Sequence, residues 1–75
     1  MKYVIANTMS EYIQYARENY KPGETRYVGH ETELYGVRGE VISVNYGYLK
    51  FDTTAHETLA AYEMAGLISV THDSI

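Results

Sequence analysis

Short contiguous apolar runs and stretches of helical apolar spacing follow one another along the chain, and together they predict alternating strands and helices. The first run, Tyr3-Val4-Ile5-Ala6, is bounded by polar residues and lacks alternation. Such a run is typical of a strand covered on both faces, as in the centre of a parallel sheet. The runs at residues 25–29 and 40–45 predict two further strands.

Two segments carry the spacing of amphipathic helices. In residues 8–19, Thr8 and Glu11 have capping-box spacing, with Asn7 as an alternative cap, and Pro22 and Gly23 follow the end of the helix. In residues 54–65, Thr54 and Glu57 repeat the capping spacing, and Gly66 is a natural C-terminal cap. The periodicity predicts that the core face of the first helix consists of Met9, Tyr12, Ile13, Ala16 and Tyr20.

Two of the three remaining segments leave more than one interpretation open. Residues 30–35 fit a single helical turn closed by Gly36. Residues 45–51 fit either a hairpin turn around Gly47 or a loop leading to the second helix, and we favour the loop. Residues 67–71 form either a short terminal strand or an apolar tail, and residues 72–75 are expected to fray.

The element order β-α-β-β-α, with a possible short terminal strand, predicts a small α/β domain. We expect one domain over residues 1–75, with a three- to four-stranded, mostly parallel sheet and two helices. The helices could cover one face of the sheet or one face each. The strand order stays open.

Composition narrows the classes of function. Six Lys and Arg against ten Asp and Glu give a net charge of −4, which argues against direct nucleic-acid binding. No apolar stretch approaches the ~20 residues of a membrane span, so we expect a cytoplasmic protein without membrane contact. The 75-residue chain has no Cys, and a domain this small buries little surface. Self-association is the remaining common route to stability, so we expect a homo-oligomer.

Nine tyrosines, beside one Phe and no Trp, are the most informative part of the composition. Tyr favours the boundary between core and water, and exposed Tyr is enriched in protein interfaces. Four tyrosines fall at positions that we expect to be buried: Tyr3, Tyr12, Tyr27 and Tyr62. The candidate interaction residues among the others are Tyr15, Tyr35, Tyr46 and Tyr48.

A second candidate site lies at the carboxyl ends of the predicted parallel strands, where α/β proteins usually bind ligands. The polar residues expected at this edge are Asn7, Thr8, His30 and Asn45. With two helix N-termini they could hold a small anion or nucleotide, although these residue types also serve simply as caps and turns. No glycine-rich phosphate loop follows the first strand, and we expect no cofactor.

The sequence lacks the motifs of metal binding and of hydrolytic catalysis. The three His residues show no metal-ligand spacing, and no Ser lies in a Gly-x-Ser-x-Gly turn. We therefore expect neither a metal site nor catalytic residues, and no enzymatic activity.

The chain resembles a loose group of short proteins encoded by tailed bacteriophages. Four segments carry the resemblance: residues 3–7, 11–12, 26–28 and 33–39, the last with the sequence Glu-Leu-x-Gly-x-x-Gly. The resemblance spans residue 3 to about residue 45. It implies a minimal Rossmann-like βαβ unit without a phosphate-binding loop, and an origin in a phage genome. It implies no activity.

Three hypotheses follow. The first is a phage-encoded interaction module that binds a host or phage protein and modulates it, with inhibition of a host enzyme or defence protein as the concrete form. The second is a module that binds or sequesters a nucleotide or other small ligand at the strand carboxyl ends. The third is a structural or assembly subunit. The sequence alone does not separate them.

Overall fold

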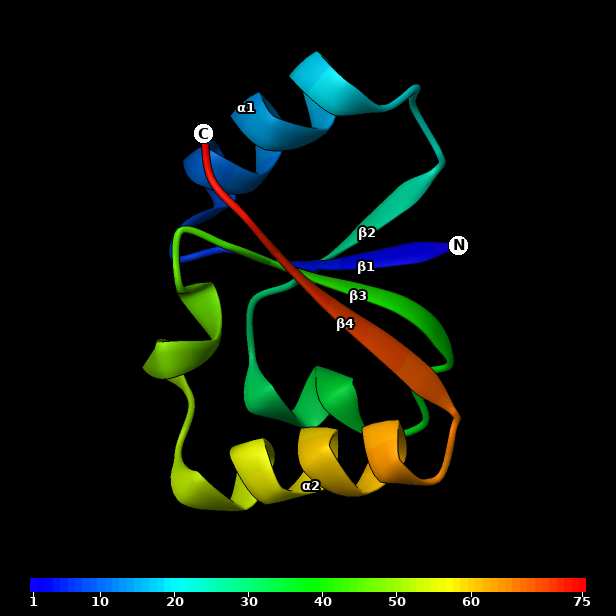
Figure 1. Ribbon diagram of the computed structural model, residues 1–75. Helices are drawn as coiled ribbons and strands as arrows, with labels where there is room; N and C mark the ends of the chain where they lie inside the picture. The colour runs from blue at the N-terminus through cyan, green and yellow to red at the C-terminus, as the bar shows by residue number, and fades with distance from the viewer.

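The computed structural model describes residues 1–75 (Figure 1). Strands and helices alternate along the chain, with two short 3-10 helices, η1 and η2, among the connections. In chain order the elements are β1 (Lys2–Ile5), α1 (Met9–Asn19), β2 (Thr25–Val28), η1 (Glu31–Leu34), β3 (Gly39–Val44), η2 (Gly47–Lys50), α2 (Thr53–Met64) and β4 (Ile68–Asp73).

All four strands are parallel and lie in the order β2-β1-β3-β4. The small α/β fold is therefore confirmed, and the C-terminal segment is a strand rather than a tail. The central pair is β1 and β3, in which Val4 lies opposite Ile42. The chain winds outward from this pair in both directions, to β2 on one side and to β4 on the other.

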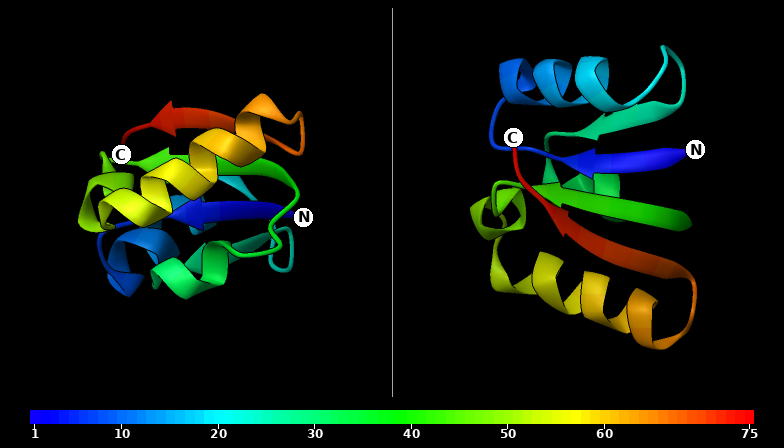
Figure 2. Two further views of the ribbon diagram at one scale, coloured as in Figure 1. Left: turned by 90° about the horizontal axis from the view of Figure 1, so that it is seen from below. Right: turned by 45° about the horizontal axis from the view of Figure 1, so that its top comes forward.

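One helix covers each face of the sheet (Figure 2, right). The central strands are consequently buried on both sides, as the uninterrupted apolar runs predict. Against α1 lies a cluster of Val4, Ala6, Tyr15, Ile42 and Val44. Against α2 and η1 lies a larger cluster of Ile5, Val28, Leu34, Val37, Val41, Phe51, Ala55, Leu59 and Ile68.

The N-terminal cap of α1 is the predicted one, whereas that of α2 is not. The Thr8 hydroxyl accepts a hydrogen bond from the amide of Glu11 at 3.1 Å. α2 begins at Thr53, within one residue of the predicted start, but the predicted Thr54 cap is wrong, because the Asp52 carboxylate caps the helix by accepting from the Ala55 amide at 2.9 Å. This hydrogen bond is the main reason that the pKa of Asp52 lies below its ordinary value. A carboxylate at the N-cap also stabilises the helix dipole.

Residues 45–51 form a loop containing η2, and the hairpin alternative is excluded. Both sides of β3 are occupied, by β1 and β4, so no strand from this segment can pair with it. The expected fraying of residues 72–75 is wrong for His72 and Asp73, which belong to β4. The Asp73 carbonyl accepts from the Asn45 amide at 2.9 Å, which extends the β3–β4 ladder to the end of the strand.

The buried face of α1 is rotated from the one that the periodicity predicts. Tyr15, expected to be exposed, is only 3% exposed, while Met9 and Ile13 are exposed. The four tyrosines expected inside are half-buried and pack on the edges of the two clusters: Tyr3, Tyr12, Tyr27 and Tyr62. The rotation places the Tyr15 ring in the smaller apolar cluster, against residues of β1 and β3, with its hydroxyl at the Asp73 carboxylate of β4.

Gly47 fixes the distance between β1 and the η2 turn, by which we mean residues 45–50. A Cβ at this position would lie 2.6 Å from the Ile5 carbonyl oxygen and 3.1 Å from the Ala6 Cα, both of them backbone atoms. We expect Gly47→Ala to lower the free energy of unfolding by about 1–3 kcal/mol, the usual cost of overpacking. Urea denaturation would measure it.

Gly23→Ala is the control, because Gly23 has a φ of 87° but no atom within 4 Å of the added Cβ. It should lose only about 1 kcal/mol, from backbone strain. A loss well below about 1 kcal/mol in Gly47→Ala would show that the η2 turn does not depend on this contact.

Candidate functional site

The carboxyl ends of β1 and β3 lie side by side at the point where the chain leaves in opposite directions. This is the position at which doubly wound α/β sheets bind ligands. Asn7 follows β1 and Asn45 follows β3, and the Asn7 side-chain amide donates to the Asn45 carbonyl at 3.1 Å. Thr8, the cap of α1, is next in the chain. The structure therefore brings three of the four predicted ligand residues together.

The hydrogen-bond donors of Asn7 and Asn45 already have an acceptor, the Glu11 carboxylate. It accepts from the Asn7 backbone amide at 3.0 Å, from the Asn7 side chain at 3.4 Å and from the Asn45 side chain at 3.2 Å. An anionic ligand would have to displace this carboxylate and would be repelled by it. The sequence pattern indicated the capping role of Glu11 but not its bridge to β3.

His30 is not part of the group. It caps η1, where its Nδ1 lies 3.1 Å from the Thr32 hydroxyl and accepts from the Thr32 amide at 3.5 Å. No hydrogen bond connects it to Asn7, Thr8 or Asn45.

Tyr15 links α1 to the end of β4. Its hydroxyl donates to the Asp73 carboxylate at 2.7 Å. Burial, followed by this hydrogen bond, raises the pKa of Tyr15 well above its ordinary value, and the same bond lowers the pKa of Asp73. The prediction that Tyr15 is an exposed interaction residue is wrong, because its ring lies in the core.

The η2 turn presents the most exposed tyrosine of the four candidates. Asn45 and Tyr46 have φ values of 50° and 58°, in the left-handed region that bulky residues seldom adopt. The Tyr46 side chain is 70% exposed, and Leu49, one turn later, is 59% exposed. No side-chain hydrogen bond compensates for the strain at Tyr46. Such strain, when it persists at an exposed residue, points to a functional constraint.

The rest of the turn is firmly held. The Tyr48 amide donates to the Ser43 hydroxyl at 3.1 Å, and the Leu49 amide donates to the Tyr46 carbonyl at 3.0 Å. The Lys50 ammonium bonds the Ala6 carbonyl and lies 5.1 Å from the centre of the Tyr27 ring. Tyr46 and Leu49 are therefore displayed on a rigid turn.

Tyr48 is half-buried, in contrast to its expected role on the surface. Its ring centroid lies 5.6 Å from that of His56 and 5.3 Å from that of His72, and it packs against the larger apolar cluster. Its carbonyl lies 2.8 Å from His56 Nε2. Its side chain therefore supports the turn from below.

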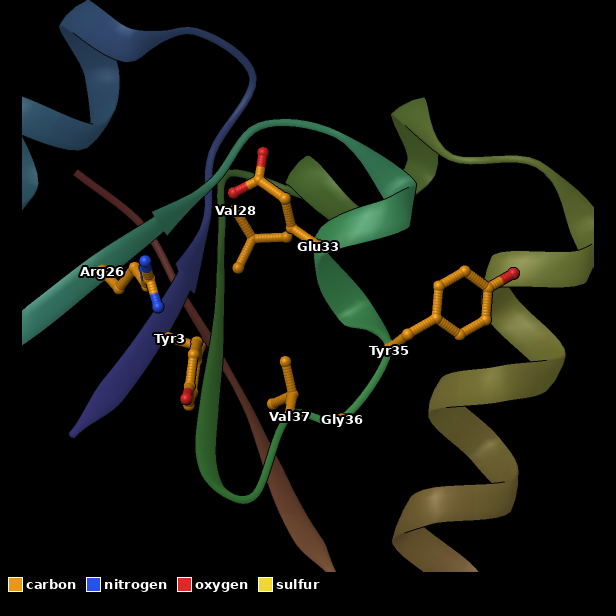
Figure 3. Close-up of a pocket in the computed structure, with 7 residues that line it drawn as sticks. All are labelled: Tyr3, Arg26, Val28, Glu33, Tyr35, Gly36 and Val37. Atoms are coloured by element: carbon orange, nitrogen blue, oxygen red, sulfur yellow. The ribbon is translucent and has the colours of Figure 1, made fainter.

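Tyr35 is 61% exposed and lies on the rim of a different feature. A hollow of about 350 Å³ opens between β2, β1 and the end of η1, and Tyr35 projects away from its other side chains (Figure 3). Arg26 and Glu33 bring opposite charges to this hollow, but both are exposed and no hydrogen bond fixes either side chain. The hollow thus lacks preorganised polar groups.

No three His, Asp or Glu side chains are grouped so that they could hold a metal ion. No helix is both long and apolar enough to span a membrane. Comparison with known proteins found no matching family model, no matching curated protein and no matching solved structure.

The Tyr15–Asp73 hydrogen bond predicts a dependence of stability on pH at both extremes. Asp73 has a lowered pKa in the folded state, so its contribution is complete above the ordinary carboxyl pKa of about 4 and is lost as the pH falls through the folded value. Tyr15 has a raised pKa, so its contribution is complete below about pH 10 and is lost as the pH rises further.

Tyr15→Phe should lower the melting temperature at pH 7 and should flatten both of these slopes, as measured by thermal unfolding from pH 2 to 11. Tyr12→Phe is the matched control, since Tyr12 is half-buried on the same helix and its hydroxyl bonds Thr25 rather than Asp73. Unchanged slopes in Tyr15→Phe would mean that other groups cause them.

Proposed function

We propose that this domain is a small protein-binding module. It binds a host or phage protein on the η2 turn and modulates that protein, most specifically by inhibiting it. The observation that carries the proposal is the exposed ring of Tyr46 on a left-handed backbone, beside the exposed Leu49. Aromatic side chains of this kind are the usual anchors of protein interfaces.

The rigidity of the turn supports the same function. An anchor that is already held in its bound conformation loses little conformational entropy on binding. The tight fit of Gly47 against the backbone of Ile5 and the hydrogen bond from the Tyr48 amide to Ser43 hold the turn in this way. Tyr35 is exposed elsewhere and is a candidate for a secondary contact. The resemblance to short phage proteins is what suggests a host or defence protein as the target.

Tyr46→Gly separates binding from stability. Glycine adopts the left-handed region freely, so the free energy of unfolding should stay the same or rise by up to about 1 kcal/mol. Loss of an aromatic anchor should weaken binding by about 2 kcal/mol, or roughly 30-fold. The wild-type domain would be used to capture its target from a bacterial lysate. The target would be identified, purified and titrated by calorimetry against the wild type and against Tyr46→Gly.

Ile13→Ser is the matched control, because Ile13 is an exposed apolar residue on α1, away from the turn. It should leave the affinity unchanged. Equal affinities for Tyr46→Gly and the wild type would overturn the assignment of η2 as the binding surface.

Ligand binding at the carboxyl ends of β1 and β3 is the second candidate function. The meeting of Asn7, Thr8 and Asn45 at the reversal of strand order favours it, and the Glu11 carboxylate opposes it. If an anion binds there, millimolar nucleotide should raise the melting temperature, and Glu11→Gln should increase that rise by removing the competing charge. A flat response from both proteins in a thermal-shift screen would exclude this function.

A further inference from the structure

The outer edge of β4 is unpaired. The Gly39 amide donates to the Leu67 carbonyl at 3.0 Å, and the Asn45 amide donates to the Asp73 carbonyl at 2.9 Å. Because peptide groups alternate along a strand, the odd-numbered residues of β4 face β3. Ile68, Val70 and His72 therefore direct their N–H and C=O groups away from the sheet. No element lies beyond β4 (Figure 2).

The two edges of the sheet differ in protection. Edge strands in natural proteins are usually short, or carry charged residues, proline or bulges that prevent further pairing. The β2 edge fits this description, with four residues and an exposed Arg26. The β4 edge is less protected, because it has six residues and neither Lys, Arg nor Pro, and its one carboxylate, Asp73, stands at its last position. Ile68, Val70 and Thr71 are β-branched.

We propose that β4 pairs antiparallel with β4 of a second copy of this chain, around a two-fold axis at Val70. In this register Ile68 lies opposite His72 on one face, and Ser69 lies opposite Thr71 on the other. Asp73, which carries the only carboxylate of the strand, falls opposite Leu67, so no like charges meet. The outward peptide groups form about six hydrogen bonds between the copies.

A second copy also covers apolar surface beside the edge. A hollow of about 210 Å³ lies between α2 and β4, with Leu59 and Val70 in its apolar lining and Glu63 and His72 in its polar lining. The helix crosses the sheet diagonally and ends near the start of β4 (Figure 2, left). The two-fold axis therefore places the end of α2 of one copy beside the hollow of the other. Met64, in the last turn of α2, is 89% exposed and is brought to this contact.

Paired charges at the two facing positions test the register. Ser69 and Thr71 are both exposed in the monomer, so lysine at either position should not unfold it. Ser69→Lys with Thr71→Lys places like charges opposite each other twice, and should raise the dimer dissociation constant more than about tenfold. Ser69→Lys with Thr71→Glu places opposite charges at the same positions and should leave the dimer intact.

Light scattering behind a sizing column would measure the mass of the full chain and of both double variants, with circular dichroism to show that each is folded. We expect twice the 8.6 kDa chain mass for the wild type and the Lys/Glu variant, and the single-chain mass for the Lys/Lys variant. A monomeric wild type, or a dimeric Lys/Lys variant, would overturn the proposal. Dissociation of both folded variants would overturn the register.

This inference goes beyond the proposed binding function and can fail separately from it. Tyr46 precedes η2 and contributes no backbone group to the edge of β4, so Tyr46→Gly should leave the mass unchanged.

Discussion

The pairing of β1 with β3 at the centre of the sheet is the interaction on which the rest of the structure depends. β1 and β3 are parallel and covered on each face. Every connection must therefore run back along one face of the sheet before the next strand begins. All four strands therefore end at the same edge of the molecule. The polar residues after β1 and β3 meet there because the fold leaves them no other place, and Glu11 satisfies their amides.

The same pairing explains the conformation of the η2 turn. The chain leaves β3 directly beside the end of β1, where the Ile5 carbonyl leaves no room for a side chain at position 47. The two residues before Gly47 take left-handed conformations to make the bend. Asn45 is suited to this conformation, whereas Tyr46 is not. The exposure and strain at position 46 are thus a consequence of the tight central packing. The packing does not require a tyrosine at this position.

The sequence predicts the elements that depend on local pattern. The run Tyr3-Val4-Ile5-Ala6 indicated a strand buried on both faces, and the Thr8 cap fixed the start of α1. The rotation of α1 could not be predicted in this way, because the partner of Tyr15 is Asp73, 58 positions further along the chain. Helical periodicity ranks apolar residues by spacing alone, and it therefore favoured Met9 and Ile13 over a tyrosine whose hydroxyl has a distant acceptor.

In the candidate site too, the sequence predicts some features and not others. Asn7, Thr8 and Asn45 were predicted to meet because parallel strands share one carboxyl edge, whereas the bridge made by Glu11 depends on distances that the sequence does not contain. Tyr46 and Tyr35 were correctly expected to be exposed, but Tyr48 has the same sequence signal and is half-buried between two imidazole rings. Leu49 was missed because a single apolar residue in a loop has no periodicity to mark it.

The two proposed surfaces adjoin each other at the end of β4. Tyr46 shares a shallow depression with His72, Asp73 and Ser74, directly beside the strand end that would pair with a second copy. In the antiparallel register, this end lies beside Leu67 of the second copy, which is itself exposed. The dimer would therefore present two copies of the Tyr46 surface, one beside each end of the paired strands. A target protein would then meet a larger apolar surface than one chain provides, and two targets could be held at once.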